Sequence, residues 1–251
     1  MEAPFQQWGL DFIGEFKDIS SNGYRWILTA TDYFTRWVES IPTKKATEEV
    51  VMNFLEDRII TRFGAPSKIT TDNAKAFISY ALVEFCFKYS IILSHSSNYY
   101  SQGNGLAEST NKNLMNILKK VVGENKKSWD SKIKYAVWAD RITTKTSTRK
   151  TPFELVYGLE AKLPVNLKIP ILRFAQQYTT DAEAIQGRIN QLIELDETRR
   201  SALGKMKRNQ EKIKNTFDHK AKERDFAEGD LLLLQDKRKE KPGMHKKFDS
   251  L

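Results

Sequence analysis

The sequence predicts an α/β fold in which helices pack on a mixed β-sheet. Three short runs rich in aromatic and apolar residues come first, at residues 8–16, 26–31 and 37–41. A turn cluster at residues 20–23 suits a hairpin between the first two runs. Helical and strand-like segments then alternate as far as residue 146. Three strands followed by this alternation imply a mixed sheet covered by helices.

The alternating part begins with a helix that Thr47 can cap and that Gly64 and Pro66 end, with apolar residues spaced between Val50 and Phe63. The later elements are a strand at 68–72, a helix at 78–89, a strand at 91–93, a polar loop at 94–105, a helix with an apolar stripe from Leu114 to Val121, and a helix at 129–146. With 251 residues the chain is long enough to bury a sizeable core.

Composition predicts a polyanionic partner and restricts the kind of metal site. The formal charge is +9 with a pI near 9.4. A single cysteine, Cys86, excludes an intrachain disulfide framework, and three histidines are too few for a zinc module. Any catalytic metal must therefore have oxygen ligands. We also expect a soluble intracellular chain, because neither a signal peptide nor an apolar run long enough to span a bilayer is present.

The positive charge is concentrated in residues 187–224, which contain 11 basic and 6 acidic residues. Few aromatics, no proline and a loose apolar spacing predict a long, solvated basic helix. Its face is either an ordinary charged surface or an arm that contacts nucleic acid, and the sequence leaves both open. On the second interpretation the phosphate contacts are Arg199, Arg200, Lys205, Lys207 and Arg208.

Three acids at the ends of predicted elements form the candidate catalytic site. Asp11 interrupts an apolar strand, Asp72 ends a strand, and Glu108 lies in the first turn of a helix. Each has an ordinary structural explanation when taken alone, as an ion-pair partner, a turn residue or a charge near a helix N-terminus. Because the ends of strands and helices crowd around the edge of a sheet, the three can converge there. We assign Asp32, in the next strand, a structural role.

Four segments around these acids resemble the catalytic core of integrases from retroviruses and, more closely, from gypsy-class long-terminal-repeat retrotransposons of plants. The resemblance covers about residues 4–170, and the order and spacing of the segments match the family. The segments are WGLDFIG (8–14), FGAPSKITTDN (63–73), YSQGNGLAESTNK (100–112) and TPFELVYG (151–158).

The resemblance implies a ribonuclease-H-like fold with a five-stranded mixed sheet flanked by helices. By motif position Asp11, Asp72 and Glu108 would be the catalytic and metal-binding triad, holding two Mg²⁺ or Mn²⁺ ions and no zinc. The implied activity is that of a polynucleotidyl transferase, which processes the 3′ ends of the element's DNA and joins them to target DNA. The implied partners are element-end DNA, target DNA and further copies of the chain, and the implied site of action is the nucleus. No membrane partner is expected.

Motif position also implies DNA contacts near the triad and shows three departures from the family pattern. The implied contacts are Gln102, Asn104, Asn111 and Lys112, and Lys119 extends them as a possible phosphate contact. The departures are Ser101 in place of proline, Asp140 in place of an aromatic residue and Arg149 in place of glycine.

We expect three parts in the chain: a catalytic core at 1–165, a linker with the basic helix at 166–224, and a fragment of a small β-barrel at 225–251. The 27 residues from Asp225 onward are too few for a whole barrel, and the zinc-binding domain that precedes the core in the family is not in this sequence.

Two functions other than DNA joining remain open. One is an inactive nucleic-acid-binding remnant, and the other is a related nuclease that cuts without joining.

Overall fold

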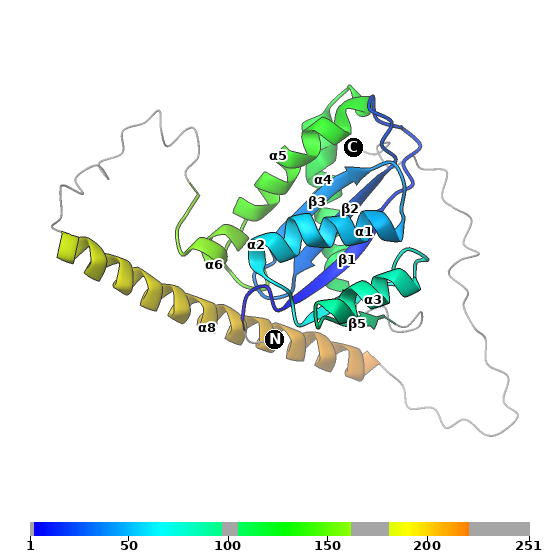
Figure 1. Ribbon diagram of the computed structural model, residues 1–251. Coiled ribbons are helices and arrows are strands. Elements are labelled where there is room, and N and C mark those ends of the chain that lie inside the picture. The colour runs from blue at the N-terminus through cyan, green and yellow to red at the C-terminus, as the bar shows by residue number, and fades with distance from the viewer. Residues whose placement is uncertain (1–2, 97–104, 162–180, 221–251) are drawn as a thin grey trace, which may run out of the picture.

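The computed structural model describes residues 3–96, 105–161 and 181–220, and contains an open five-stranded mixed sheet with helices on both faces (Figure 1). The strand order across the sheet is β3-β2-β1-β4-β5. β1, β2 and β3 pair antiparallel, whereas β4 runs parallel to β1 and β5 parallel to β4. The strands are β1 (Gln7–Ile13), β2 (Trp26–Asp32), β3 (Val38–Thr43), β4 (Lys68–Thr71) and β5 (Ile92–His95).

The helices pack on the sheet in two layers, with a long helix that follows them in the chain. They are α1 (Glu48–Phe54), the π-helical segment η1 (Leu55–Ile60), α2 (Thr61–Phe63), α3 (Tyr80–Lys88), α4 (Gly105–Val122), the 3-10 segment η3 (Lys126–Ser128), α5 (Trp129–Ile142), α6 (Pro152–Tyr157) and α8 (Asp181–Lys220). Among the described residues, no helix is both long and apolar enough to cross a membrane.

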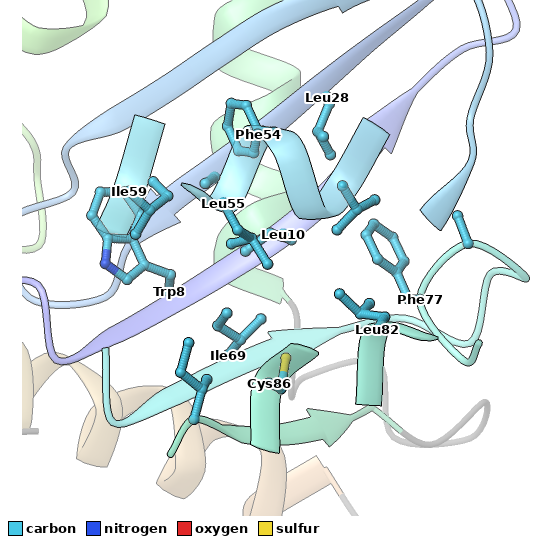
Figure 2. Close-up of a cluster of buried hydrophobic side chains, with 14 of the residues drawn as sticks. Trp8, Leu10, Leu28, Phe54, Leu55, Ile59, Ile69, Phe77, Leu82 and Cys86 are labelled. Carbon is cyan, nitrogen blue, oxygen red and sulfur yellow. The ribbon is translucent and has the colours of Figure 1, made fainter. Parts of the chain in front are cut away.

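Alternation along β1 separates two cores. Trp8 and Leu10 point to one face, where Leu28 and Ile69 from the neighbouring strands meet the continuous helix α1-η1-α2 and helix α3 (Figure 2). Ile13 belongs to the other core, which α4 and α5 cover with Leu114, Leu118, Trp129, Ile133 and Val137. Asp11, two residues before Ile13, shares its face of the sheet, so its side chain lies on the side covered by α4.

The motif at residues 151–158 forms the short helix α6 because both of its ends have favourable residues. The Thr151 hydroxyl accepts a hydrogen bond from the Glu154 amide, and the Glu154 carboxylate accepts one from the Thr151 amide, which is a capping box. Pro152 occupies the first turn, and Gly158 ends the helix in the left-handed conformation at φ 72°.

Helix α8 is anchored near its middle to α6. The Arg199 guanidinium donates hydrogen bonds to the carbonyl oxygens of Leu155 (2.9 Å) and Val156 (3.2 Å). Leu195 of α8 lies over Gly158, where a Cβ would come within 3.2 Å of a Leu195 methyl group, and Ala202 and Met206 are buried. The long basic helix is thus a packed element of the core over this stretch.

The strands and helices predicted between residues 8 and 146, and the basic helix, are present with different ends. The predicted mixed sheet is confirmed, and the first strand ends at Ile13 instead of residue 16. The helix expected to reach residue 146 ends at Ile142, and the basic helix expected from residue 187 begins at Asp181. The predicted barrel fragment at 225–251 and the linker at 166–180 lie outside the described residues, and the proposed domain boundaries stay predictions.

Candidate active site

Asp11 and Asp72 occupy matching positions on two adjacent parallel strands. The parallel register pairs Gly9 of β1 with Thr70 of β4, and two further residues along both strands bring Asp11 beside Asp72. Asp72 directly follows β4, and its Oδ1 accepts a hydrogen bond from the Ala74 amide at 3.0 Å, which turns the chain away from the sheet. The parallel pairing therefore places two carboxyl groups, 60 positions apart in sequence, at the same edge of the sheet.

Helix α4 brings Glu108 to the same edge. Glu108 lies in the first turn of α4, and Asn111, one turn later, is buried against the sheet. The Asn111 amide donates a hydrogen bond to Asp11 Oδ2 at 2.7 Å, and its carbonyl oxygen lies 2.9 Å from the Thr29 hydroxyl on β2. Since residues three apart lie on one helical face, this attachment turns the Glu108 side of α4 toward Asp11.

Negative charge accumulates at Asp11. The pKa of this carboxyl is raised from 3.8 to about 7, mainly by burial, then by the charge of Asp72 and to a smaller extent by that of Glu108. Hydrogen bonds from the Phe12 amide and from Asn111 oppose the shift. Among the described residues none of the three acids has an ion-pair partner. The two other acids are therefore close enough to act on Asp11 electrostatically.

The three carboxylates are of the kind that suits a hard divalent cation, although their oxygens do not converge on one point. Carboxylate oxygens are the ligands that Mg²⁺ and Mn²⁺ prefer, and the uncompensated charge at Asp11 favours a cation. In the part of the chain that the structure describes, no three His, Cys, Asp or Glu side chains already converge to hold a metal ion. Asp11 and Asp72 are instead held by the Asn111 and Ala74 hydrogen bonds.

The predicted DNA contacts near the triad fall into three groups. Lys112 is exposed one turn after Glu108, and Lys119 is half-buried near the end of α4. Asn111 is 8% exposed, and its amide is already bonded to Asp11, which gives it a structural position that the motif did not reveal. Gln102 and Asn104 lie outside the described residues. Contact with DNA stays a prediction for all five.

The predicted basic contacts on α8 lie away from the triad. Ala3, Pro4 and Phe34 share a hollow with Arg199 and Arg200, so α8 crosses the end of the sheet where β1 begins and the β2–β3 turn lies. Asp11 and Asp72 lie toward the opposite end of their strands. Arg199 bonds the end of α6, Lys205 is half-buried, and Arg200, Lys207 and Arg208 are exposed.

Asp32 and two of the departures from the family pattern have structural explanations. Asp32 is fully buried and accepts hydrogen bonds from the Phe5 amide and from the amide and hydroxyl of Thr35, as expected of a structural acid. Asp140 is buried and pairs with Lys145 at 2.5 Å. Arg149 has φ 58°, the left-handed conformation that favours glycine, so the glycine expected there would be less strained. The third departure, Ser101, lies outside the described residues.

Comparisons with known proteins agree with this geometry. The family model described as "Integrase core domain" matches residues 1–101, which include Asp11 and Asp72. The Gag-Pol polyprotein of Avian reticuloendotheliosis virus is 32% identical over 158 residues, which is 63% of this chain and 14% of that polyprotein. Over residues 1–101 the chain is similar to integrase core domains. It is also homologous to the Transposon Tf2-3 polyprotein of Schizosaccharomyces pombe, with 27% identity over 236 residues, 93% of this chain and 17% of that polyprotein.

A solved structure supports the same fold for the integrase core. The simian T-cell lymphotropic virus intasome, determined in complex with PP2A regulatory subunit B56 gamma, matches with a TM-score of 0.55 and 25% identity over 72% of this chain and 62% of that one. The five-stranded mixed sheet flanked by helices is the ribonuclease-H-like fold of integrases. The match to the yeast transposon extends over α8, since it covers 93% of the chain. The chain itself spans less than a fifth of either polyprotein.

Thr29 is a residue of the integrase core site that the sequence analysis missed. Its hydroxyl lies 3.1 Å from the Asp11 carbonyl oxygen and 2.9 Å from Asn111 Oδ1, so it links the strand of one acid to the helix of another. The hairpin register places Thr29 directly opposite Asp11. The sequence did not reveal it, because the long connection between Ile13 and Trp26 leaves the register of this strand pair open.

Proposed function

We propose that this chain is a metal-dependent polynucleotidyl transferase that processes the 3′ ends of a retrotransposon's DNA and joins them to target DNA. Similarity to integrase core domains and to a retrotransposon polyprotein supports DNA integration in general. The observation that supports the specific chemistry is the accumulation of charge at Asp11, whose pKa is raised to about 7 in part by Asp72 and Glu108.

In the proposed site Asp11, Asp72 and Glu108 hold two Mg²⁺ or Mn²⁺ ions. Such ions lower the pKa of a bound nucleophile and neutralise a leaving oxygen, which is what phosphodiester cleavage and joining require. Asn111 fixes the orientation of the Asp11 carboxylate through its 2.7 Å hydrogen bond. Lys112, exposed on the next turn after Glu108, is placed to contact a phosphate. Water is the first nucleophile and the freed 3′-hydroxyl the second, so no side chain becomes covalently attached to DNA.

The proposed partners follow from the same chemistry. They are the DNA ends of the element, the target DNA and further copies of this chain, since a joining reaction must hold two DNA ends together. An excess of basic residues over the whole chain favours such polyanionic partners. We also propose that the reaction takes place in the nucleus, where target DNA is found.

One observation favours an inactive, DNA-binding remnant as the second candidate. Among the residues that the structure describes, no three potential ligands already converge on a metal ion. The Arg149 departure adds a strained position to the fold. On this alternative the sheet, the helices and the basic surface are retained while the acids do not bind metal together.

The two candidates are separated by a joining assay. Purified chain is incubated with a labelled blunt DNA duplex, a supercoiled plasmid and Mg²⁺ or Mn²⁺, beside Glu108→Gln and the matched variant Glu124→Gln, which removes an exposed charge in the turn after α4. We expect joined product from the wild type and from Glu124→Gln and none from Glu108→Gln. Equal product from all three contradicts the triad, and nicked plasmid without joined product indicates a nuclease.

A further inference from the structure

Charge is strongly polarised along α8. Residues 181–198 contain five acidic residues and one arginine, whereas residues 199–214 contain seven basic residues and one acid, Glu211. Complementing the helix dipole explains charges in the first and last turns only. The basic stretch lies in the middle of the helix and ends six residues before Lys220, so the dipole does not account for it.

The exposed cations of α8 form two rows. Arg200, Lys207 and Lys214 follow one another at seven-residue intervals, which is two turns, so they lie along one line about 10.5 Å apart. Lys205, Arg208 and Lys212 form a second row at i, i+3 and i+7. At about 100° per residue the rows lie on either side of the face that points away from the core, because Leu195, Ala202 and Met206 define the opposite, buried face.

These six cations are available to a partner. Within the described part of the chain none of them has an ion pair, and all except the half-buried Lys205 are exposed. Gly204 lies on the outward face between the rows, with no side chain to obstruct an approaching surface. Each strand of duplex DNA carries one phosphate per about 3.4 Å of helix axis, so cations about 10.5 Å apart match about every third phosphate of a strand.

Arg199 differs from these six because its guanidinium is turned toward the core. It bonds two carbonyl oxygens at the end of α6 and lies 3.9 Å from Asp196. A guanidinium at a helix C-terminus also interacts favourably with the helix dipole. Together with Leu195 over Gly158 it fixes the direction of α8 relative to the sheet.

We propose that Arg200, Lys207 and Lys214, flanked by Lys205, Arg208 and Lys212, form a phosphate-binding rail for double-stranded DNA, and that Arg199 is the joint that holds the rail at a fixed angle to the core. The proposal rests on the proposed DNA-joining function, and it divides the seven basic residues of 199–214 into six that contact DNA and one that contacts the protein. Lys212 and Lys214 are new members of the DNA-facing group.

The rail is tested by the salt dependence of DNA binding, measured with a labelled duplex in EDTA so that catalysis plays no part. Each phosphate contact contributes about 0.9 to the slope of log K against log salt, so Arg200→Gln/Lys207→Gln/Lys214→Gln is expected to lower the slope by about 2.7. The matched control, Lys45→Gln/Lys88→Gln/Lys134→Gln, removes the same charge from exposed positions outside α8. It is expected to leave the slope unchanged.

Equal slopes for the two triple variants would overturn the rail, as would tighter binding to a single strand than to the duplex. Neither result bears on the triad, which the joining assay tests separately.

The joint is tested by Arg199→Lys, which keeps the charge but not the paired hydrogen bonds of the guanidinium. Spin labels at Gln210→Cys on α8 and Lys45→Cys on the core report their separation, and the native Cys86 is buried and does not interfere. We expect a narrow distance distribution with Arg199 and a broad one with lysine, at an unchanged salt slope. A narrow distribution for both would overturn the assignment of Arg199.

Discussion

Two acids of one sheet, the half-buried Asp11 on β1 and the buried Glu39 on β3, lie in opposite electrostatic surroundings. Glu39 Oε1 lies 2.8 Å from Arg62, 2.7 Å from Arg141 and 2.8 Å from the Trp37 indole nitrogen. Arg141 also bonds the Val38 carbonyl and lies 4.1 Å from the Trp37 ring. Asp11 has an amide partner, Asn111, and two acids as its charged neighbours.

The contrast separates a structural acid, Glu39, from the proposed metal-binding acid, Asp11. Two cations and an indole satisfy Glu39, and the group ties β3 to α5 and to the helix that ends in α2. At Asp11 the protein keeps like charges together without a cation, which destabilises the metal-free fold. Such an arrangement persists where a ligand supplies the missing charge, and this is why Asp11 is the better marker of function.

The largest predicted change in stability concerns Glu39, the structural acid. Glu39→Gln leaves Arg62 and Arg141 facing a neutral amide in a buried site, so we expect a loss of about 3–5 kcal/mol in the free energy of unfolding. Urea denaturation measures it. The control, Glu15→Gln, breaks the exposed pair with Arg25 and is expected to change stability by less than about 1 kcal/mol. Similar losses in both variants would contradict the account of Glu39.

Asp11→Asn is expected to change the free energy of unfolding in the opposite direction, so that the variant is more stable than the wild type. The folded-state pKa of about 7 lies above the unfolded value of 3.8, so folding favours the protonated carboxyl, and stability is lost as the pH rises from about 4 to about 7. Asparagine is neutral throughout. In EDTA the variant is therefore expected to be more stable than the wild type by on the order of 2–4 kcal/mol at pH 8 and nearly equal to it at pH 4. A variant that is less stable at pH 8 would show that the charge at Asp11 is compensated.

Asn111→Ala tests the support of Asp11. Loss of its hydrogen bonds to Asp11 and Thr29 frees the carboxylate to rotate, and partners of this kind typically change metal affinity or activity by about 10–100-fold. The measurement is the joining rate across a Mn²⁺ series, in which a positioning role appears as a shift to higher metal concentration. Asn116→Ala, exposed on the same helix, is the control and should behave as wild type.

The smallest predicted change in stability concerns Arg149, which belongs neither to the surroundings of Asp11 nor to those of Glu39. Arg149→Gly relieves a left-handed backbone at φ 58° and is expected to raise the free energy of unfolding by about 1 kcal/mol. Thr146→Gly in the same loop, at a position without positive φ, should lower it slightly. Thermal denaturation compares the two. Destabilisation by both would mean that the Arg149 side chain stabilises the loop.

The sequence predicted the order of the elements and the positions of the three acids, because strand alternation, turn residues and motif spacing are local features. It did not predict that Asn111 and Arg199 turn inward. That depends on how α4 and α8 are rotated about their axes, which their packing on β1 and α6 decides. The Glu39 cluster was also missed, since its members come from three elements more than 20 positions apart along the chain.

The central claim is that Asp11, Asp72 and Glu108 together bind divalent cations. Calorimetric titration of the full chain with Mn²⁺ at pH 7.5, beside Asp72→Asn, tests it most directly. We expect binding by the wild type, accompanied by proton release from Asp11, and no comparable binding by Asp72→Asn, because the variant removes a proposed ligand and one of the two charges that add to the effect of burial on the pKa of Asp11. Equal Mn²⁺ binding by the two proteins, or none by the wild type, would contradict the account.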